Sequence, residues 1–327
     1  MTHQFPMTLL AQIDDVAVFQ TAAFSSDDVD SQEQLVRQQR QANYGELNLG
    51  LHVNDDAAKV LSNRMRLLSA INEQLAPLSS TACQQVPIKR LHWVNQVHGK
   101  QIHDIDGTAL GMTPMSADAM VSRQQGLGLA IMTADCVPIV LYQPASGQMA
   151  AIHAGWQGLA CGVIQATVQY FTQSGQIKAW IGVCISQDSY EVGAQVRNQL
   201  LKGCTENKLL NTASIEHFDS LYVIDSVAII KGDSNTQHVQ DTVDKRSSCN
   251  TVDARKIKLN LPKLAADQLS ASGVIVDDTL SSSCSYTDDH YYSYRRQTHL
   301  QQLLQVEWRW SLYVALRRIT LFAVARN

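Results

Sequence analysis

The sequence predicts an α/β or α+β domain built in layers, and three observations lead to this fold class. Short apolar runs of strand length alternate with segments whose apolar residues recur at helical spacing. Hydrophobic residues make up 45% and charged residues 17% of the chain, which is typical of a globular protein. At 327 residues the chain is long enough to bury a sizeable core between such layers.

The first part of the chain is expected to contain a strand within residues 14–25 and a strand that leads into a turn at LNLGLHVNDD, residues 47–56. Apolar residues near helical spacing predict a helix over 57–76. A strand in LHWVNQV, residues 91–97, then ends directly before His98.

The run LGLAIMTADCVPIVLYQPASGQMAAIHAGWQG, residues 127–158, predicts two apolar strands, a turn at PASG and a third strand. We expect a helix from about 158 to 173, then a strand in IKAWIGVCI and a helix in VGAQVRNQLL. The segment KLNLPKLAADQLSASGV predicts a helix with Pro262 in its first turn and Gly273 at its end.

Two segments differ from this pattern. Residues 205–256 are polar and are interpreted as an insertion that carries a strand in LYVIDSVAII. Residues 300–327 mix apolar side chains with arginines, and a terminal helix or strand on the fold is the favoured interpretation. The alternative is an amphipathic helix that contacts a membrane or a partner.

Charge and composition narrow the function classes. A net charge of −4 and a pI near 6.2 give no electrostatic footprint for nucleic acid. The N-terminus lacks the features of a signal peptide, and no apolar run reaches the roughly 18 residues of a membrane span. Seven cysteines without the spacing of a disulfide framework indicate a cytoplasmic protein with free or metal-bound thiols. Small-molecule chemistry is therefore the default.

Polar residues interrupt the apolar run 127–158, where Asp135, Cys136 and His153 stand among residues expected to be buried. Burying such groups costs several kcal/mol, about 2–7, unless each finds a partner. Each residue taken alone has an ordinary explanation, because a buried cysteine usually behaves as a small hydrophobic residue. The three together call for a common explanation.

The turn at PASG leads to a common explanation, because it sets how the two flanking strands pair. If Gln143 faces Gln148, antiparallel pairing places Cys136 opposite Gly155, with His153 as its diagonal neighbour on the same face. Two such side chains can converge on a shared ion.

His98, at the end of another strand, completes a set of one cysteine and two histidines with Cys136 and His153. Three protein ligands with an open fourth position are typical of catalytic zinc. Two alternatives stay open: Cys136 could be a nucleophile activated by a histidine, as in Cys–His hydrolases, or the zinc could be structural. A structural site needs a fourth ligand, for which His103 is the closest candidate by sequence.

HAGWQG, residues 153–158, adds a second feature. Gly155 and Gly158 bracket a turn into a helix N-terminus, where free N–H groups favour an anion such as phosphate. The alternative is a simple turn.

Eight motifs taken in order resemble the laccase-domain family, also called multicopper polyphenol oxidoreductase-like, whose bacterial members are generally described as purine nucleoside phosphorylases. The resemblance covers roughly residues 12–296 and rests on LNLGLHV, SNR, VNQVHG, ADAMVS, TADCVPI, HAGW, YEVG and YSYRR.

The resemblance implies a single α/β domain over residues 1–299, with mixed sheets sandwiched between helices and an atypical tail at 300–327. It implies zinc held by His98, Cys136 and His153. It also implies an enzyme that phosphorolyses adenosine, inosine, guanosine and methylthioadenosine and deaminates adenosine. The chain is expected to be a monomer. Some bacterial members are credited with an amidase role on wall precursors.

The chain departs from the family pattern at three places. IGVCISQ replaces the usual IGPCIGP-like stretch, and Asn260 stands where an acid is usual. After Arg296 the usual DGxTGR continuation gives way to QTHLQQLLQV. A shifted reading frame near Gln297 would account for this loss, a hypothesis that resequencing the source DNA would test.

Roles follow for the remaining candidates. Zinc would lower the pKa of a bound water for deamination, with Asp135 as proton carrier or as a group that orients a ligand. Phosphorolysis needs a cation near the phosphate, for which Arg64 and Arg296 are candidates, with surface salt bridges as the alternative. Asn48 and Gln96 are candidates for binding sugar or base, or for satisfying backbone groups.

A four-copper oxidase needs about ten histidines, mostly in His-x-His pairs. This chain has ten in all and none in such a pair, so laccase chemistry is not expected. Copper at the cysteine and histidine set stays an alternative to zinc.

Overall fold

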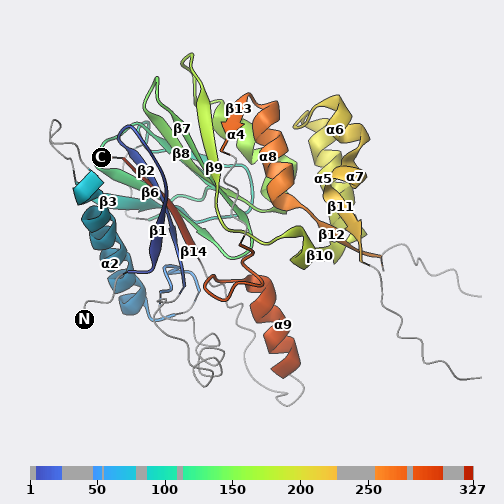
Figure 1. The fold of residues 1–327 in the computed structure, drawn as a ribbon, viewed down its shortest axis with the longest axis horizontal. Helices are drawn as coiled ribbons and strands as arrows, with labels where there is room; N and C mark the ends of the chain where they lie inside the picture. The colour runs from blue at the N-terminus through green and yellow to red at the C-terminus, as the bar shows by residue number, and fades with distance from the viewer. Residues whose placement is uncertain are drawn as a thin grey trace, which may run out of the picture.

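Two mixed β-sheets lie face to face at the centre of the molecule, and helices cover their outer faces (Figure 1). The computed structural model describes residues 5–23, 47–53, 55–78, 87–108, 113–226, 255–277, 283–304 and 320–326. The predicted fold class, an α/β protein with mixed sheets between helices, is confirmed.

The first sheet has five strands in the order β1-β2-β14-β6-β3. Only β3 and β6 run parallel within it, and its other neighbouring strands are antiparallel. The strand expected within 14–25 is β2, and β1 precedes it as the other half of a hairpin. The bounds are Met7–Ile13 for β1, Val16–Thr21 for β2, Arg90–Trp93 for β3, Leu127–Thr133 for β6 and Thr320–Arg326 for β14.

The second sheet has six strands in the order β13-β9-β7-β8-β5-β4. Its hairpin β7–β8 pairs Gln143 with Gln148 and Val137 with Ala154, which confirms the register deduced from the PASG turn. The bounds are Ile102–Asp104 for β4, Ala119–Ser122 for β5, Val137–Gln143 for β7, Gln148–Ala154 for β8, Ile177–Ile181 for β9 and Val274–Val276 for β13.

Helix α2, Ala57–Leu75, confirms the helix expected over 57–76 and covers the outer face of the first sheet (Figure 1). Its apolar residues Leu67 and Ile71 are fully buried against that face. The helix begins at Asp56, whose carboxylate accepts a hydrogen bond from the Ala58 N–H at 2.9 Å. The short 3-10 helix η1, Ala76–Leu78, follows it.

The strand expected at the start of 47–56 does not form in the described residues 47–53. Asn48 provides the reason, because its buried side chain accepts a hydrogen bond from the Gly50 N–H at 3.0 Å. Such local side-chain bonds compete with strand pairing.

The single helix expected from about 158 to 173 is wrong. The segment instead forms α3, Trp156–Cys161, and α4, Val163–Val168, which are separated by Gly162 in the left-handed conformation at φ 84°. A glycine in this conformation ends a helix at little steric cost, so the first helix stops after six residues. The helix N-terminus predicted at HAGWQG therefore belongs to a very short helix.

Helix α8, Leu261–Ala271, packs on the second sheet, and α5, Ala194–Glu206, packs on α3 next to it. Helix α8 has Pro262 in its first turn as predicted, and Asn260 caps it by accepting a hydrogen bond from the Lys263 N–H at 3.1 Å. Asn260, where the resemblance leads us to expect an acid, thus serves as a helix cap. Helix α5 confirms the helix expected in VGAQVRNQLL.

A small third sheet, β10-β12-β11, lies beside α5. The strand expected in LYVIDSVAII is confirmed only in part, because residues 218–222 are helical and a strand follows at 223–225. Residues 227–254 lie outside the described residues. The bounds are Gln187–Ser189 for the 3-10 helix η2, Glu191–Gly193 for β10, Thr212–Glu216 for α6, Phe218–Tyr222 for α7, Val223–Asp225 for β11 and Lys256–Leu259 for β12.

The last part of the chain contributes elements to the fold. Helix α9, Tyr294–Leu304, is followed after an interval outside the described residues by β14, which pairs with both β2 and β6. The favoured interpretation of 300–327, a terminal helix or strand on the fold, holds for 300–304 and 320–326. Across the described ranges, every helix is too short or too polar to cross a membrane.

Two stacked histidines link the sheets, His92 in β3 and His103 in β4, with ring centroids 5.0 Å apart. Burial lowers the pKa of His92 from 6.5 to about 4, and the neighbouring His103 and Arg90 add to the effect. Burial also lowers the pKa of His103. For His92 the window runs from the ordinary pKa of 6.5 in the unfolded chain down to about 4 in the folded protein. Within it the unfolded chain binds more protons than the folded one, so the free energy of unfolding falls as the pH falls.

A His92→Gln variant is therefore expected to lose part of this acid sensitivity. Urea unfolding at about pH 7 and about pH 5 measures it, and the decrease in stability should be smaller for the variant than for the wild type. His217→Gln, at an exposed histidine, is the matched control and should keep the wild-type pH dependence. If all three proteins lost the same amount of stability between the two pH values, the assignment of this acid sensitivity to His92 would be wrong.

Candidate metal centre and active-site cavity

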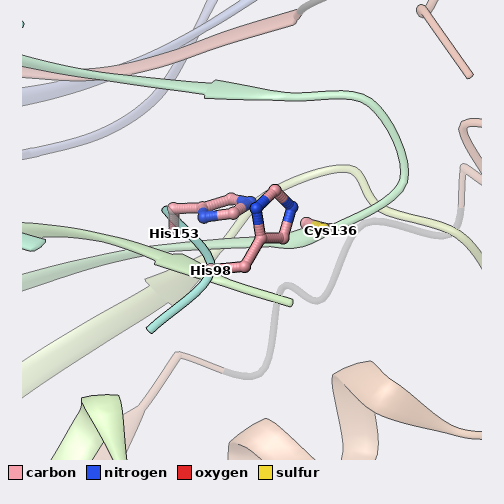
Figure 2. A group of neighbouring side chains, drawn as sticks. All are labelled: His98, Cys136 and His153. Carbon is pink, nitrogen blue, oxygen red and sulfur yellow. The ribbon is translucent and has the colours of Figure 1, made fainter. Parts of the chain in front are cut away.

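His98, Cys136 and His153 come together at one end of the second sheet, and their ligand atoms all lie within 4.8 Å of one another (Figure 2). The two imidazole rings meet edge to face, with centroids 4.7 Å apart. Each side chain comes from a different segment, as the sequence predicts. Their role as metal ligands stays a prediction.

Unusual backbone conformations lie at or next to two of these side chains. His98 has a φ of 60°, and Asp135, directly before Cys136, has a φ of 91°. Residues with a side chain rarely adopt these values. Such conformations persist where the surrounding structure enforces them, and they occur often at functional sites. Here they turn His98 and Cys136 toward His153, which sits in the regular strand β8.

Asp118 holds the group together, and sequence reasoning did not single it out. Its fully buried carboxylate accepts hydrogen bonds from the backbone N–H groups of His98 at 2.8 Å and Gly99 at 2.6 Å. The same carboxylate lies 2.9 Å from Nδ1 of His153. A carboxylate in this position fixes the orientation of a histidine ligand and directs its Nε2 away.

The thiol of Cys136 has the electrostatics of a metal ligand. Burial alone would raise its pKa, but the charge and hydrogen bonds of His153 and His98 outweigh burial and lower the pKa from 9.0 to about 6. Burial likewise would lower the pKa of His153, yet Cys136 and Asp118 raise it to about 9. The site thus favours a thiolate, which is the form that binds metals.

The donor set fits a divalent metal ion. One thiolate and two imidazoles suit zinc or copper, and three protein donors leave a coordination position open. Within the described part of the chain no fourth histidine, cysteine or carboxylate joins this group. His103, the candidate fourth ligand, instead stacks on His92.

Gly155 faces this site without a side chain to obstruct it. A Cβ atom added there would lie 3.0 Å from Sγ of Cys136 and 3.3 Å from Cδ2 of His98. Its φ of −74° suits any residue, so the effect of a substitution is steric.

A Gly155→Ala variant is therefore expected to fold normally but to displace two of the three donors. We expect about a tenfold loss of zinc affinity, measured by competition with a chromogenic chelator. An unchanged circular dichroism spectrum checks the fold. Wild-type affinity in a well-folded variant would contradict the observed packing.

A cavity of about 300 Å³ opens over the three side chains. Aromatic side chains, Trp156, Tyr190 and Tyr294, form part of its wall, and Arg295 supplies a cation. The size lies at the lower end of the range for small-molecule sites.

Asp135 lines the same cavity. Its two oxygens accept hydrogen bonds from Ser285 Oγ and from the Arg295 backbone N–H, each at 2.7 Å. Burial raises the pKa of this carboxyl, although these hydrogen bonds oppose the effect.

Of the predicted substrate-binding residues, only Gln96 lines the cavity. Its amide pairs with the backbone of Met132, donating at 2.7 Å and accepting at 2.9 Å. Asn48 lies outside the cavity, where its amide group also donates a hydrogen bond to Asp55 at 2.9 Å. The hydrogen bonds of both residues match their alternative role, in which the side-chain amides pair with neighbouring polar groups of the protein.

The two arginines predicted to bind phosphate do not line the cavity either. Arg64 lies 3.8 Å from the centre of the Trp93 ring and donates a hydrogen bond to the Leu49 carbonyl at 2.8 Å. Burial lowers its pKa to about 10. Arg296 donates to the carbonyls of Ser285 at 2.7 Å, Tyr286, Asp288 and Tyr291. Its neighbour Arg295 occupies the cavity wall instead.

Sequence reasoning thus missed several residues of the site, among them Asp118, Tyr190 and Arg295. Each of these three lies inside a motif that carries the family resemblance, ADAMVS, YEVG and YSYRR. The signal was available, since a polar residue in such a motif is a candidate for a site. Which of two adjacent arginines faces the cavity required coordinates.

Comparisons with known proteins agree with this architecture. The purine nucleoside phosphorylase YfiH of Shigella flexneri is 36% identical, and that of Escherichia coli 35% identical, each over 177 residues that cover 54% of this chain and 65% of the relative. A purine nucleoside phosphorylase of Pseudomonas aeruginosa is 35% identical over 167 residues, 51% of this chain and 61% of the relative. The chain thus matches less than two thirds of the length of these relatives.

Solved structures share the fold. A Neisseria meningitidis protein superposes with a TM-score of 0.62 at 20% identity over 99% of both chains. The hypothetical protein YfiH of Bacillus licheniformis gives a TM-score of 0.63 at 19% identity, covering 98% of this chain and 97% of the other.

A family model described as multi-copper polyphenol oxidoreductase laccase matches residues 36–249 and 230–304. This match extends over most of the chain and includes His98, Cys136 and His153. The chain therefore belongs to the multi-copper polyphenol oxidoreductase laccase family.

Proposed function

We propose that this chain is a zinc-dependent purine nucleoside phosphorylase that accepts adenosine, inosine, guanosine and methylthioadenosine and also deaminates adenosine. The observation that carries the proposal is the group of His98, Cys136 and His153 at a cavity of about 300 Å³. The names of the relatives that are about 35% identical support the phosphorylase part of this proposal.

The cavity wall suits a nucleoside. Trp156, Tyr190 and Tyr294 offer aromatic surface against which a purine can stack, and Met132 and Leu261 add apolar surface. A few polar groups among apolar ones are typical of sites that orient a small molecule.

Phosphorolysis forms a bond between a phosphate oxygen and C1′ of the ribose and breaks the bond from C1′ to the purine nitrogen. The leaving purine must gain a proton or a hydrogen bond at that nitrogen. A zinc ion held by His98, Cys136 and His153 would supply a Lewis acid and a bound water of lowered pKa. Asp118 keeps the His153 ring in one orientation throughout.

Asp135 is our candidate proton carrier. Burial raises the pKa of its carboxyl above its ordinary value, which is the direction that suits a proton carrier. In deamination it would pass a proton to the amino group that leaves C6 of adenine.

The decisive experiment incubates the purified, zinc-loaded protein with adenosine and phosphate and resolves the products by chromatography. Adenine with ribose 1-phosphate is the expected result of phosphorolysis, and inosine is the expected result of deamination. Absence of all three products at full zinc occupancy would reject the nucleoside assignment.

The pKa of Cys136 near 6 favours one second candidate, a Cys–His hydrolase or amidase in which this thiolate is the nucleophile. Metal analysis separates the two. Stoichiometric zinc that protects Cys136 from iodoacetamide, read by peptide mass spectrometry, supports the metal site, whereas rapid labelling of the as-purified enzyme supports the nucleophile.

Copper is the other candidate occupant, because the same donor set accepts it. A copper-dependent polyphenol oxidation would require oxygen consumption with a phenolic substrate by the copper-loaded protein. We expect none above that of free copper, because the ten histidines include no His-x-His pair.

A further inference from the structure

Arg295 and Tyr190 lie side by side on the cavity wall, with the guanidinium carbon 5.4 Å from the centre of the phenol ring. Both line the cavity that contains Cys136 and His153. They come from different parts of the fold, since Arg295 lies in α9 and Tyr190 lies between η2 and β10.

Arg295 is held by two hydrogen bonds, which leave part of its guanidinium group unpaired within the described ranges. Its backbone N–H donates to Asp135 at 2.7 Å, and its Nη1 donates to the carbonyl oxygen of Glu191. Among the described residues, no hydrogen-bond acceptor pairs with its Nε or Nη2. A positive group with unpaired donors at a cavity wall is suited to an anion.

Tyr190 is also held by its backbone. Its N–H donates to the Ser186 carbonyl at 3.0 Å, and its carbonyl accepts from the Leu259 N–H at 3.1 Å. Its hydroxyl has no hydrogen-bond partner in the described part of the chain. The phenol therefore adds a neutral donor beside the guanidinium.

The other charges near the cavity leave this pair as the natural anion site. Both oxygens of Asp135 already accept hydrogen bonds, so they are turned toward Ser285 and the Arg295 backbone. Arg296 is saturated by backbone carbonyls, and Arg64 stacks outside the cavity. Arg295 is the arginine among these three that faces the cavity.

We propose that Arg295 and Tyr190 form the subsite for the phosphate that attacks the nucleoside. The proposal rests on the proposed phosphorylase function. Phosphate offers only acceptor oxygens at its unprotonated positions, and a guanidinium fork binds two of them at once. The phenol hydroxyl donates to a third oxygen, which leaves the remaining one to attack C1′.

Binding of inorganic phosphate to the zinc-loaded protein, measured by isothermal titration calorimetry, tests the subsite without turnover. Arg295→Gln is expected to weaken phosphate binding by about 10- to 100-fold. Arg295→Lys keeps the charge but loses the fork, so a smaller loss of about tenfold or less is expected. Tyr190→Phe should cost about threefold to tenfold.

Arg255→Gln is the matched control for loss of one arginine charge, because Arg255 is exposed and pairs with Asp225 on the surface. It should bind phosphate like the wild type. Thermal unfolding confirms that each variant is folded, and the lysine variant keeps the test valid if the glutamine variant is not.

Steady-state kinetics give a second measurement. Arg295→Gln should raise KM for phosphate by a similar factor, whereas Arg255→Gln should leave KM for phosphate and the rate of deamination within about twofold of the wild type. Unchanged phosphate binding in the Arg295 variants, or no phosphate binding by the wild type, would overturn the subsite. A wild type that binds phosphate but yields no adenine or ribose 1-phosphate would instead overturn the proposed function.

Discussion

Replacing Cys136 by alanine is expected to remove the metal and the phosphorylase activity together. The thiolate is one of three donors and carries the negative charge that offsets a divalent ion. We expect the zinc content to fall from about one equivalent per chain to below about a tenth. We also expect kcat/KM for adenosine to fall by more than the roughly 10- to 100-fold typical of residues that only orient a ligand. Plasma mass spectrometry and product chromatography measure the two effects.

Cys161→Ala is the matched control, because Cys161 is an exposed free thiol in the neighbouring helix α3. It should keep both zinc and activity. A Cys136→Ala protein that retained its zinc but lost turnover would show that the thiol acts as a nucleophile, and the ligand assignment would then be wrong.

Asp118→Asn is expected to weaken metal binding by about 10- to 100-fold, because Asp118 sets the orientation of His153. The amide that replaces the carboxylate has one acceptor oxygen instead of two. At least one of the N–H groups of Val97, His98 and Gly99 then loses its partner. The metal-free variant should therefore also be less stable by about 1–3 kcal/mol.

Chelator competition and urea unfolding of the metal-free protein measure the two effects of Asp118→Asn separately. Asp106→Asn is a suitable control, since Asp106 also accepts hydrogen bonds from a side chain and a backbone N–H, those of Ser122 and Arg123. It should lose stability at most and keep zinc affinity. If Asp118→Asn kept wild-type zinc affinity, the orienting role of Asp118 would be ruled out.

The proximity of Cys136 and His153 could be predicted from sequence because a short turn determines the pairing of a hairpin. Once Gln143 faces Gln148, every later pair along β7 and β8 is fixed, and the side-chain alternation decides the shared face. His98 could be placed there only by the chemistry of the donor set and by the family resemblance. Its φ of 60° has no simple sequence signal beyond the glycine that follows.

The rest of the site depends on contacts between distant segments. Nothing local distinguishes Arg295 from Arg296, since the choice depends on which guanidinium meets the carbonyls of residues 285–291. The break at Gly162 was missed because helical spacing of apolar residues continues across it. The packing partner of Gly162, Leu209, lies on a remote segment that the local pattern does not reveal.

Strand β14 has a consequence for biosynthesis. It pairs with β2 and with β6, and no other strand joins these two in the described sheet. On the ribosome both partners emerge long before residues 320–326 are made, so a nascent chain carries two open strand edges until translation reaches β14. Unpaired edges attract pairing with other chains, so the nascent chain is exposed to aggregation at these two edges until β14 covers them.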